Sequence, residues 1–304
     1  MQLSDGIAPE AGCGPPAPAS ANLIEALLTL LHRESNPANV RVVRTRLVEL
    51  GPSVLPWLDR AVAEHASVQA SSVALEIRRR QLNPDWRRWA SHPHPDLEQG
   101  VLLIDRFGDP AVDQNAVRRA LDGLASELRR RLIGKKDADT VISILTEHLF
   151  GEVGLRGNTE AYDEPENSYL GQVLARKRGI PVSLSVVVML VGHRVGLPIA
   201  GIGMPGHFLV RYGSHEDGPF LDAFGGGRRL TKAQCAEWLE ASGFEFAPRM
   251  LRPVSSREIV ARMLRNLITV FKTRESDSEV AMLSDYLDVT LRSTLSPTTM
   301  SPGA

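Results

Sequence analysis

The chain has 304 residues, which exceeds the usual size of one domain and predicts about two domains with ample length for a hydrophobic core. Its 35 lysines and arginines balance 36 aspartates and glutamates, so no net charge recruits nucleic acid or an anionic membrane surface. The two cysteines, Cys13 and Cys235, provide no disulfide framework and favour a reducing compartment, the cytoplasm.

Residues 1–21 contain alanine, glycine and proline but no lysine or arginine. They also lack a continuous apolar stretch, so they predict a disordered tail and not a secretory signal. The longest apolar run, residues 186–191, is far shorter than the roughly 18 residues that a membrane span needs. We therefore expect no membrane association.

Helical periodicity then extends over residues 22–90. Leu23 and Leu27 begin one apolar stripe, and Gly51, followed by proline, ends the next. The stretch "LVELGPSVLPWLDRAV", residues 47–62, is typical of the helix-turn-helix unit of a HEAT-type repeat. An ordinary small helical bundle is the alternative.

The stretch "NPDWRRWASHPHPD", residues 83–96, contains three prolines and predicts a linker. His92 and His94 each precede a proline, which imposes extended backbone, and the sequence nearby offers no further ligand cluster. We therefore expect a solvated turn at these histidines and not a metal site.

Residues 97–152 carry three amphipathic segments and lead into an acidic loop, "GEVGLRGNTEAYDEPENSY", residues 151–169. A loop of this length is expected to cover a site. Near its end, Asn167 either orders the loop or caps the next helix, predicted over residues 168–178. Basic residues favour the C-terminal end of that helix, and Gly179 supplies its cap.

The next segment predicts a helix that is buried on all sides. It begins near Pro181 and is apolar around nearly its whole circumference up to His193 and Arg194. Short extended runs separated by glycines follow and predict antiparallel strands. These runs are "IAGIG" (199–203), "HFLVRY" (207–212) and "PFLDAF" (219–224).

Two further helices carry the signature of a capping box, Thr231 with Gln234 and Ser255 with Glu258. Residues 293–304 predict a second disordered tail. The whole order predicts an α+β fold, in which a helical region precedes a buried helix packed on a small antiparallel sheet and C-terminal helices follow.

A candidate catalytic pair lies in the predicted sheet. His207 begins one strand and Asp222 lies near the end of the next, so Asp222 can hold the imidazole tautomer and stabilise an imidazolium. The alternative is that His207 only closes a turn. A third partner is expected at the start of the buried helix, where the dipole and free N–H groups favour a thiolate or an oxyanion. This order of helix, base and acid is that of papain-like and transglutaminase-like sites.

The stretch from Leu97 to Leu291 resembles the bacterial SirB-type transglutaminase-like family. The resemblance implies a transglutaminase-like cysteine-protease core over residues 97–254, with a helical lead-in, in which His207 and Asp222 match the catalytic pair. It also implies that residues 255–292 are the truncated start of tetratricopeptide-like helices. The resemblance rests on "NSYL" (167–170), "GIP" (179–181), "PGHF" (205–208) and Asp222.

The nucleophile of active transglutaminases has no match in this chain. Transglutaminases proper carry Gly-x-Cys at the start of the buried helix, whereas residues 179–181 are Gly-Ile-Pro, the usual pattern of the resembled family. Ser183, or less favourably Ser185, could attack with His207 as base, but both hydroxyls could instead bond the first helical turn. Cys235 shares its helix face with apolar residues and is interpreted as a small buried hydrophobe.

Two functions follow from these patterns. The first is a non-catalytic scaffold, or pseudoenzyme, that binds a protein or peptide, with the helices before residue 97 as a second interaction surface. The second is an amide or ester hydrolase or acyl-transferase that uses Ser183, His207 and Asp222. We expect no metal and no cofactor. The glycines at 225–227 lack the strand-glycine-helix context of a phosphate loop, so they predict no nucleotide site.

Overall fold

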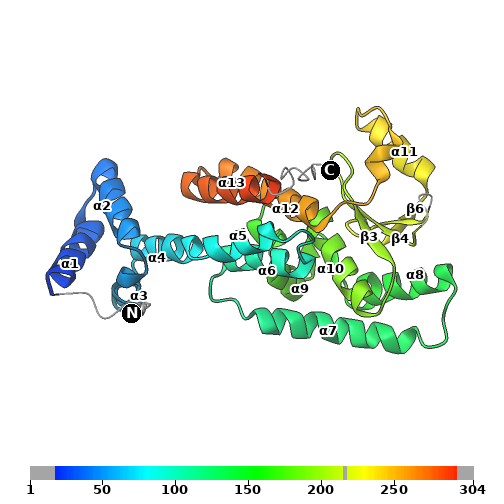
Figure 1. Cartoon of the computed structure of the whole chain (residues 1–304), viewed down its shortest axis with the longest axis horizontal. Helices are drawn as coiled ribbons and strands as arrows, with labels where there is room; N and C mark the ends of the chain where they lie inside the picture. The colour runs from blue at the N-terminus through cyan, green and yellow to red at the C-terminus, as the bar shows by residue number, and fades with distance from the viewer. Residues whose placement is uncertain (1–17, 215–217, 293–304) are drawn as a thin grey trace, which may run out of the picture. The chain divides into compact units, whose positions relative to one another are not determined.

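The computed structural model describes residues 18–214 and 218–292. The tails predicted at residues 1–17 and 293–304 lie outside these described residues. The chain divides into two compact units, and the boundary falls after Gln81 (Figure 1). Each unit is described by itself below.

The first unit is helical throughout its described residues. Its elements are α1 (Pro18–Arg33), α2 (Pro37–Leu50), the 3-10 turn η1 (Gly51–Val54), α3 (Leu55–His65) and α4 (Val68–Arg80). Because α1 begins at Pro18, residues 18–21 are helical, and the prediction that they belong to a tail is wrong. Proline is tolerated at a first helical position, where its missing N–H would be unpaired anyway. The break at Gly51 is confirmed, with a φ of 67°. The HEAT-type repeat stays a prediction.

The second unit begins with a helical lead-in. Its helices are α5 (Asn83–Ser91), α6 (Leu97–Gly108), α7 (Gln114–Arg131) and α8 (Ala138–Thr146). The prediction of a linker at residues 83–96 is wrong because α5 occupies most of it. Trp86 stacks on Tyr286 with 4.7 Å between ring centroids, and its indole N–H donates to the Tyr286 carbonyl at 3.2 Å. Pro84 lies in the first turn of α5, where it breaks no hydrogen bond.

The π-helical turn η2 (Glu147–Glu152) leads into the acidic loop. The loop itself contains two short ordered elements, the strand β1 (Arg156–Gly157) and the 3-10 turn η3 (Pro165–Asn167). After the loop, α9 (Leu170–Arg176) is shorter than the predicted helix. Lys177, with a φ of 57°, forms the left-handed cap that was predicted for Gly179. Gly179 instead belongs to β2 (Arg178–Gly179), which pairs in parallel with β1.

The predicted buried helix is α10 (Pro181–Arg194), and it is confirmed as buried over nearly its whole length. The predicted antiparallel sheet is also confirmed, with a fourth strand that the sequence analysis missed. The sheet has the order β3 (Ile199–Ile202), β4 (Leu209–Tyr212), β5 (Phe220–Asp222) and β6 (Arg228–Leu230).

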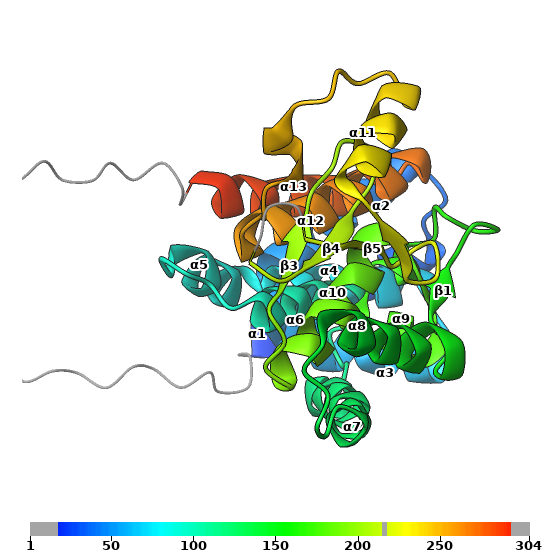
Figure 2. The same cartoon turned by 90° about the vertical axis from the view of Figure 1, so that its right-hand side faces the viewer.

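The two faces of this sheet pack against different helices. Phe208, Val210 and Leu221 belong to the same hydrophobic core as α10. Leu209 and Phe220, which alternate with them, pack with residues of α11 (Lys232–Ala241). Figure 2 shows the sheet between α10 and α11.

The chain continues through the 3-10 turn η4 (Pro248–Leu251) to α12 (Ser256–Thr273) and α13 (Asp277–Arg292). Both predicted capping boxes are confirmed, Thr231 with Gln234 and Ser255 with Glu258. The α+β fold class is therefore as predicted, with helices before and after a small antiparallel sheet. Within residues 18–214 and 218–292, no helix combines the length and the apolar character needed to cross a membrane.

Candidate functional site

The structure brings His207 and Asp222 together. Val210 pairs with Leu221 across β4 and β5, and continuing this register places Leu209 opposite Asp222. His207, two residues before Leu209, therefore lies on the same face of the sheet. Its Nε2 is 2.9 Å from Asp222 Oδ1.

The environment of Asp222 keeps its carboxyl group ionised. Burial raises its pKa, but hydrogen bonds from His207 and from the Gly225 N–H, at 3.0 Å to Oδ1, together with the Arg228 charge, outweigh burial and lower the pKa below its usual value. An ionised carboxylate accepts a hydrogen bond, so it holds the imidazole proton on Nε2. Nδ1 is then the basic nitrogen. It has no bonding partner among the described residues, and it is not one of the polar atoms sealed from solvent.

Two aromatic rings flank this imidazole. Trp238 of α11 lies 5.3 Å from His207 between ring centroids, and Phe224 meets it edge-on at 6.4 Å. Tyr162 of the acidic loop meets Phe224 edge-on at 6.0 Å. We call Tyr162, Phe224, His207 and Trp238 the aromatic row. All four side chains are partly exposed, so the row offers accessible aromatic surface beside the pair.

The pair lies on the sheet face that α11 covers. His207 and Asp222 alternate with Phe208 and Leu221, which pack with α10. Cys235 of α11 is close enough to Asp222 to respond to its charge. Burial, and then that charge, raise the pKa of the Cys235 thiol to about 11. Cys235 is therefore a buried neutral thiol, as predicted.

Ser183 is not brought to His207. Its hydroxyl donates to the Asn167 carbonyl at 2.6 Å and accepts from the Ile180 N–H at 3.1 Å, so it caps the first turn of α10. No hydrogen bond joins it to His207 among the described residues, and His207 Nε2 already bonds Asp222. Ser185 is fully buried, and its hydroxyl has no partner among the described residues.

A pair of buried asparagines holds the acidic loop against the start of α10. The Asn158 amide donates to Asn167 Oδ1 at 2.9 Å, and the Asn167 amide donates to the Ala161 carbonyl at 2.7 Å. The Asn158 N–H bonds the Gly179 carbonyl at 2.9 Å. Asn167 therefore orders the loop and does not cap α9. Sequence reasoning missed Asn158, although an asparagine directly after a glycine in a polar loop is a recognisable turn signal.

The first N–H groups of α9 bond a side chain that sequence reasoning also missed. The carboxyl group of Asp105, on α6, accepts the N–H groups of Leu170 and of Gly171, the latter at 2.8 Å. Asp105 is separated by 65 residues from Leu170, so no local pattern indicates the contact.

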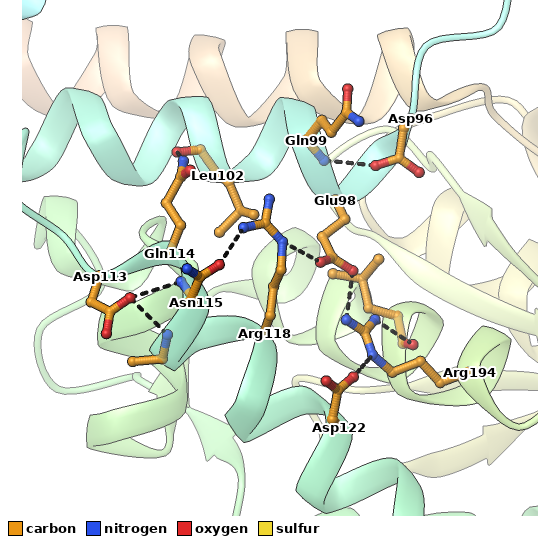
Figure 3. A network of polar contacts seen from close by, with 12 residues as sticks. Asp96, Glu98, Gln99, Leu102, Asp113, Gln114, Asn115, Arg118, Asp122 and Arg194 are labelled. Carbon is orange, nitrogen blue, oxygen red and sulfur yellow. Dashed lines mark hydrogen bonds and ion pairs between the residues drawn. The ribbon is translucent and has the colours of Figure 1, made fainter.

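The far end of α10 is fixed by an ion-pair network (Figure 3). Arg194 bonds Glu98 of α6 at 2.7 Å and Asp122 of α7 at 2.8 Å. Arg118 of α7 bonds Glu98 at 3.3 Å. The network ties three helices together and so helps to hold α10 in place.

The structure gives no support to a metal centre in the part of the chain that it describes, where no three metal-binding side chains are grouped. His92 Nδ1 lies 2.7 Å from the backbone carbonyl of His94, so this histidine takes part in a local turn, as expected.

Two kinds of comparison place the chain among known proteins. A family model described as "Transglutaminase-like superfamily" matches residues 115–265, which include α10, the sheet and α11. A UPF0162 protein of Xylella fastidiosa strain Temecula1 is 32% identical over 197 residues, 63% of this chain and 70% of the relative. A UPF0162 protein of Vibrio cholerae is 28% identical over 173 residues, covering 56% of this chain and 64% of that protein.

F-box only protein 21 of Homo sapiens is 30% identical over 159 residues, which are 50% of this chain and 25% of that protein. No solved structure matches the chain.

Proposed function

The chain belongs to the UPF0162 family of transglutaminase-like proteins, and we propose that its transglutaminase-like core is a non-catalytic scaffold that binds a protein or peptide. Within that superfamily we assign it to the bacterial SirB-type family. The motifs at residues 167–170, 179–181 and 205–208 support this assignment.

The observation that carries the proposal is the engagement of Ser183. Its hydroxyl is buried and bonds both the Ile180 N–H and the Asn167 carbonyl, so its hydrogen bonds cap the first turn of α10. A serine nucleophile needs a base within hydrogen-bond reach. The start of α10 also carries Pro181 in the Gly-Ile-Pro pattern, where transglutaminases proper carry cysteine.

One observation favours the alternative, an amide or ester hydrolase or acyl-transferase. The His207–Asp222 pair is formed, and His207 Nδ1 reaches solvent, so the imidazole could still accept a proton. In that case Ser183 would have to leave its cap to become the nucleophile.

Covalent labelling separates the two functions. The full chain is treated with a fluorophosphonate and with an activated acyl ester, in parallel with Ser183→Ala, His207→Ala and Ser185→Ala. The scaffold predicts labelling that is absent or identical in all four proteins. Labelling that is lost in the first two variants and kept in Ser185→Ala would establish the serine enzyme. The Ser185 variant is the matched control because that hydroxyl lies on the same helix two residues away.

We also propose that the N-terminal helices are a second interaction surface, of HEAT-like type. A cavity of about 410 Å³ lies within this unit, between residues of α1, α3 and α4. Arg60 stacks over the ring of Trp57 at its wall, 5.6 Å from the ring centroid. Replacement of Arg60 by glutamate should weaken a complex formed through this surface, and an unchanged set of co-purified partners would contradict the proposal.

A further inference from the structure

Arg262 of α12 is a half-buried cation beside the candidate site. Its Nη1 donates to the Met204 carbonyl at 2.8 Å, and its guanidinium lies over the Phe208 ring, 5.7 Å from the centroid. No carboxylate of the described residues pairs with it, and burial lowers its pKa. A guanidinium has five donors, and a partly desolvated one without a counter-ion is costly. An added anion would therefore be stabilised at this position.

Arg262 and the backbone of His207 share one hydrogen-bond acceptor. The Met204 carbonyl that accepts Arg262 Nη1 also accepts the His207 backbone N–H, at 3.2 Å. Arg262 thus lies at the turn that presents His207 to solvent.

Tyr162 lies within electrostatic range of the same guanidinium. Burial raises the pKa of Tyr162, and the Arg262 charge lowers it. Tyr162 is 46% exposed, and its hydroxyl has no hydrogen-bond partner among the described residues. Through Phe224, its ring also belongs to the aromatic row that contains His207.

We propose that Arg262, Tyr162 and His207 form a subsite that recognises the carboxylate of an acidic peptide. The inference rests on the proposed function, in which the core binds a peptide, and it names the chemistry of that ligand. Arg262 takes the carboxylate, the Tyr162 hydroxyl donates a second hydrogen bond, and His207 Nδ1 accepts a peptide N–H. An apolar neighbouring side chain of the peptide packs on Phe224 and Trp238.

The charges of the site favour a carboxylate over a dianionic phosphate. The half-buried Arg262 offers the ligand one guanidinium, which balances one negative charge, whereas the charge of the neighbouring Arg265 is screened by solvent. Asp222 is ionised, and the exposed Asp163 follows Tyr162 directly in the chain, so a second negative charge on the ligand would meet repulsion. The carboxylate could belong to an Asp or Glu side chain or to a peptide C-terminus, because the chemistry is the same.

Three short peptides test the subsite and separate these sources. Acetyl-Phe-Glu-amide carries a side-chain carboxylate, acetyl-Phe-Gly carries a free C-terminal carboxylate, and acetyl-Phe-Gln-amide carries neither. Their affinities for the full chain at neutral pH are measured by NMR titration. At least one acid should bind about tenfold or more tighter than the glutamine peptide, and the tighter acid identifies the source. Equal affinity of all three peptides, or binding of none, overturns the subsite.

Variants locate the carboxylate. Arg262→Gln should abolish the preference for the acid. Arg265→Gln should largely preserve it, because Arg265 is exposed three residues further along the same helix, so solvent screens its charge even though that charge acts on Arg262. Tyr162→Phe removes only an exposed hydroxyl, so it should fold normally and weaken the acid about threefold to tenfold. A preference that survives both Arg262→Gln and Tyr162→Phe overturns the proposal.

The same titrations test the non-catalytic scaffold and the carboxylate subsite separately. Cleavage of a probe peptide by the chain would contradict the non-catalytic scaffold and leave the subsite standing. Binding of intact peptides without any preference for the acid would contradict the subsite and leave the scaffold standing.

Discussion

His207 and Asp222 form a hydrogen-bonded pair, with 2.9 Å between Nε2 and Oδ1, on the sheet face covered by α11. Both side chains are largely buried, and the carboxylate also accepts the Gly225 N–H. The pair therefore contributes to folding whether or not it contributes to chemistry, because its loss leaves buried donors without an acceptor.

Replacement of Asp222 by alanine should lower the free energy of unfolding at pH 7 by about 3 kcal/mol, the usual cost of breaking a buried pair. Asp222→Asn should cost less, about 1 kcal/mol, because an amide oxygen can still accept one of the two hydrogen bonds. Urea denaturation measures both values. Glu245→Gln is the control, since Glu245 is exposed. Substitutions of exposed residues usually change the free energy of unfolding by no more than about 0.5 kcal/mol. A loss below about 0.5 kcal/mol for the alanine variant would therefore contradict a stabilising buried pair.

The lowered pKa of Asp222 also predicts an acid dependence. A carboxyl group whose folded pKa lies below its unfolded value stabilises the fold above the unfolded pKa, about 3.9 for an aspartate. That stabilisation is lost as pH falls through the folded pKa. The stability difference between the wild type and Asp222→Asn should therefore shrink between about pH 5 and acid unfolding. A difference that stays constant over that interval would show that Asp222 titrates normally.

Ser183 and Ser185 should respond in opposite ways to the same substitution. Ser183→Ala removes the acceptor of the Ile180 N–H and a donor to the Asn167 carbonyl, so it should destabilise by about 1–2 kcal/mol. Ser185→Ala removes a buried hydroxyl that has no partner among the described residues, so it should be neutral or stabilising by up to about 1 kcal/mol. Thermal and urea unfolding of the two variants check both signs. Equal effects would contradict the capping role of Ser183.

Features encoded by neighbouring residues could be predicted from the sequence. The capping boxes at Thr231 and Ser255 place a hydroxyl and its partner three residues apart, and both form. The short apolar runs between glycines became strands because the period of two is local. The meeting of His207 with Asp222 followed from strand order.

Features that depend on residues distant in the chain could not be predicted. Trp86 is buried by Tyr286, 200 residues away, so a segment with three prolines is a helix and not a linker. Asp105 accepts a hydrogen bond from Leu170 of α9, which lies 65 residues further along the chain. The engagement of Ser183 depends on the Asn167 carbonyl, whose position is set by the folded loop and not by the helix sequence.

Close packing around Phe224 predicts that replacing Gly157 lowers the stability of the fold. A Cβ at Gly157 would lie 2.7 Å from the Phe224 ring and 2.8 Å from its carbonyl oxygen, and backbone cannot move aside cheaply. Gly157→Ala should therefore destabilise by about 1–3 kcal/mol. Gly123→Ala is the matched control, because nothing lies within 4 Å of its Cβ and it is inside α7. That variant should gain up to about 1 kcal/mol. Equal denaturation midpoints would refute the packing argument.

Asp105 predicts a pH dependence of the opposite sign to that of Asp222. Its carboxyl group is buried beneath α9 and accepts the N–H groups of Leu170 and Gly171. Burial raises its pKa to about 7, against the lowering effect of both hydrogen bonds. In the unfolded chain the value is about 3.9. Between these two values the folded protein binds more protons than the unfolded chain, so this group's contribution to stability is greatest below about pH 4 and is lost as pH rises to 7.

The wild type should therefore lose on the order of 3 kcal/mol of stability relative to Asp105→Asn between about pH 4.5 and pH 7, at about 1.4 kcal/mol per pH unit. The asparagine keeps an oxygen that can accept an N–H from α9 but has no proton to release. Urea denaturation of both proteins across this range measures the difference. Glu237→Gln controls for the loss of an exposed carboxylate, and its free energy of unfolding should vary with pH in parallel with that of the wild type. Parallel curves for Asp105→Asn as well would mean that Asp105 is already ionised in the folded protein at pH 4.5, and that the two N–H groups outweigh its burial.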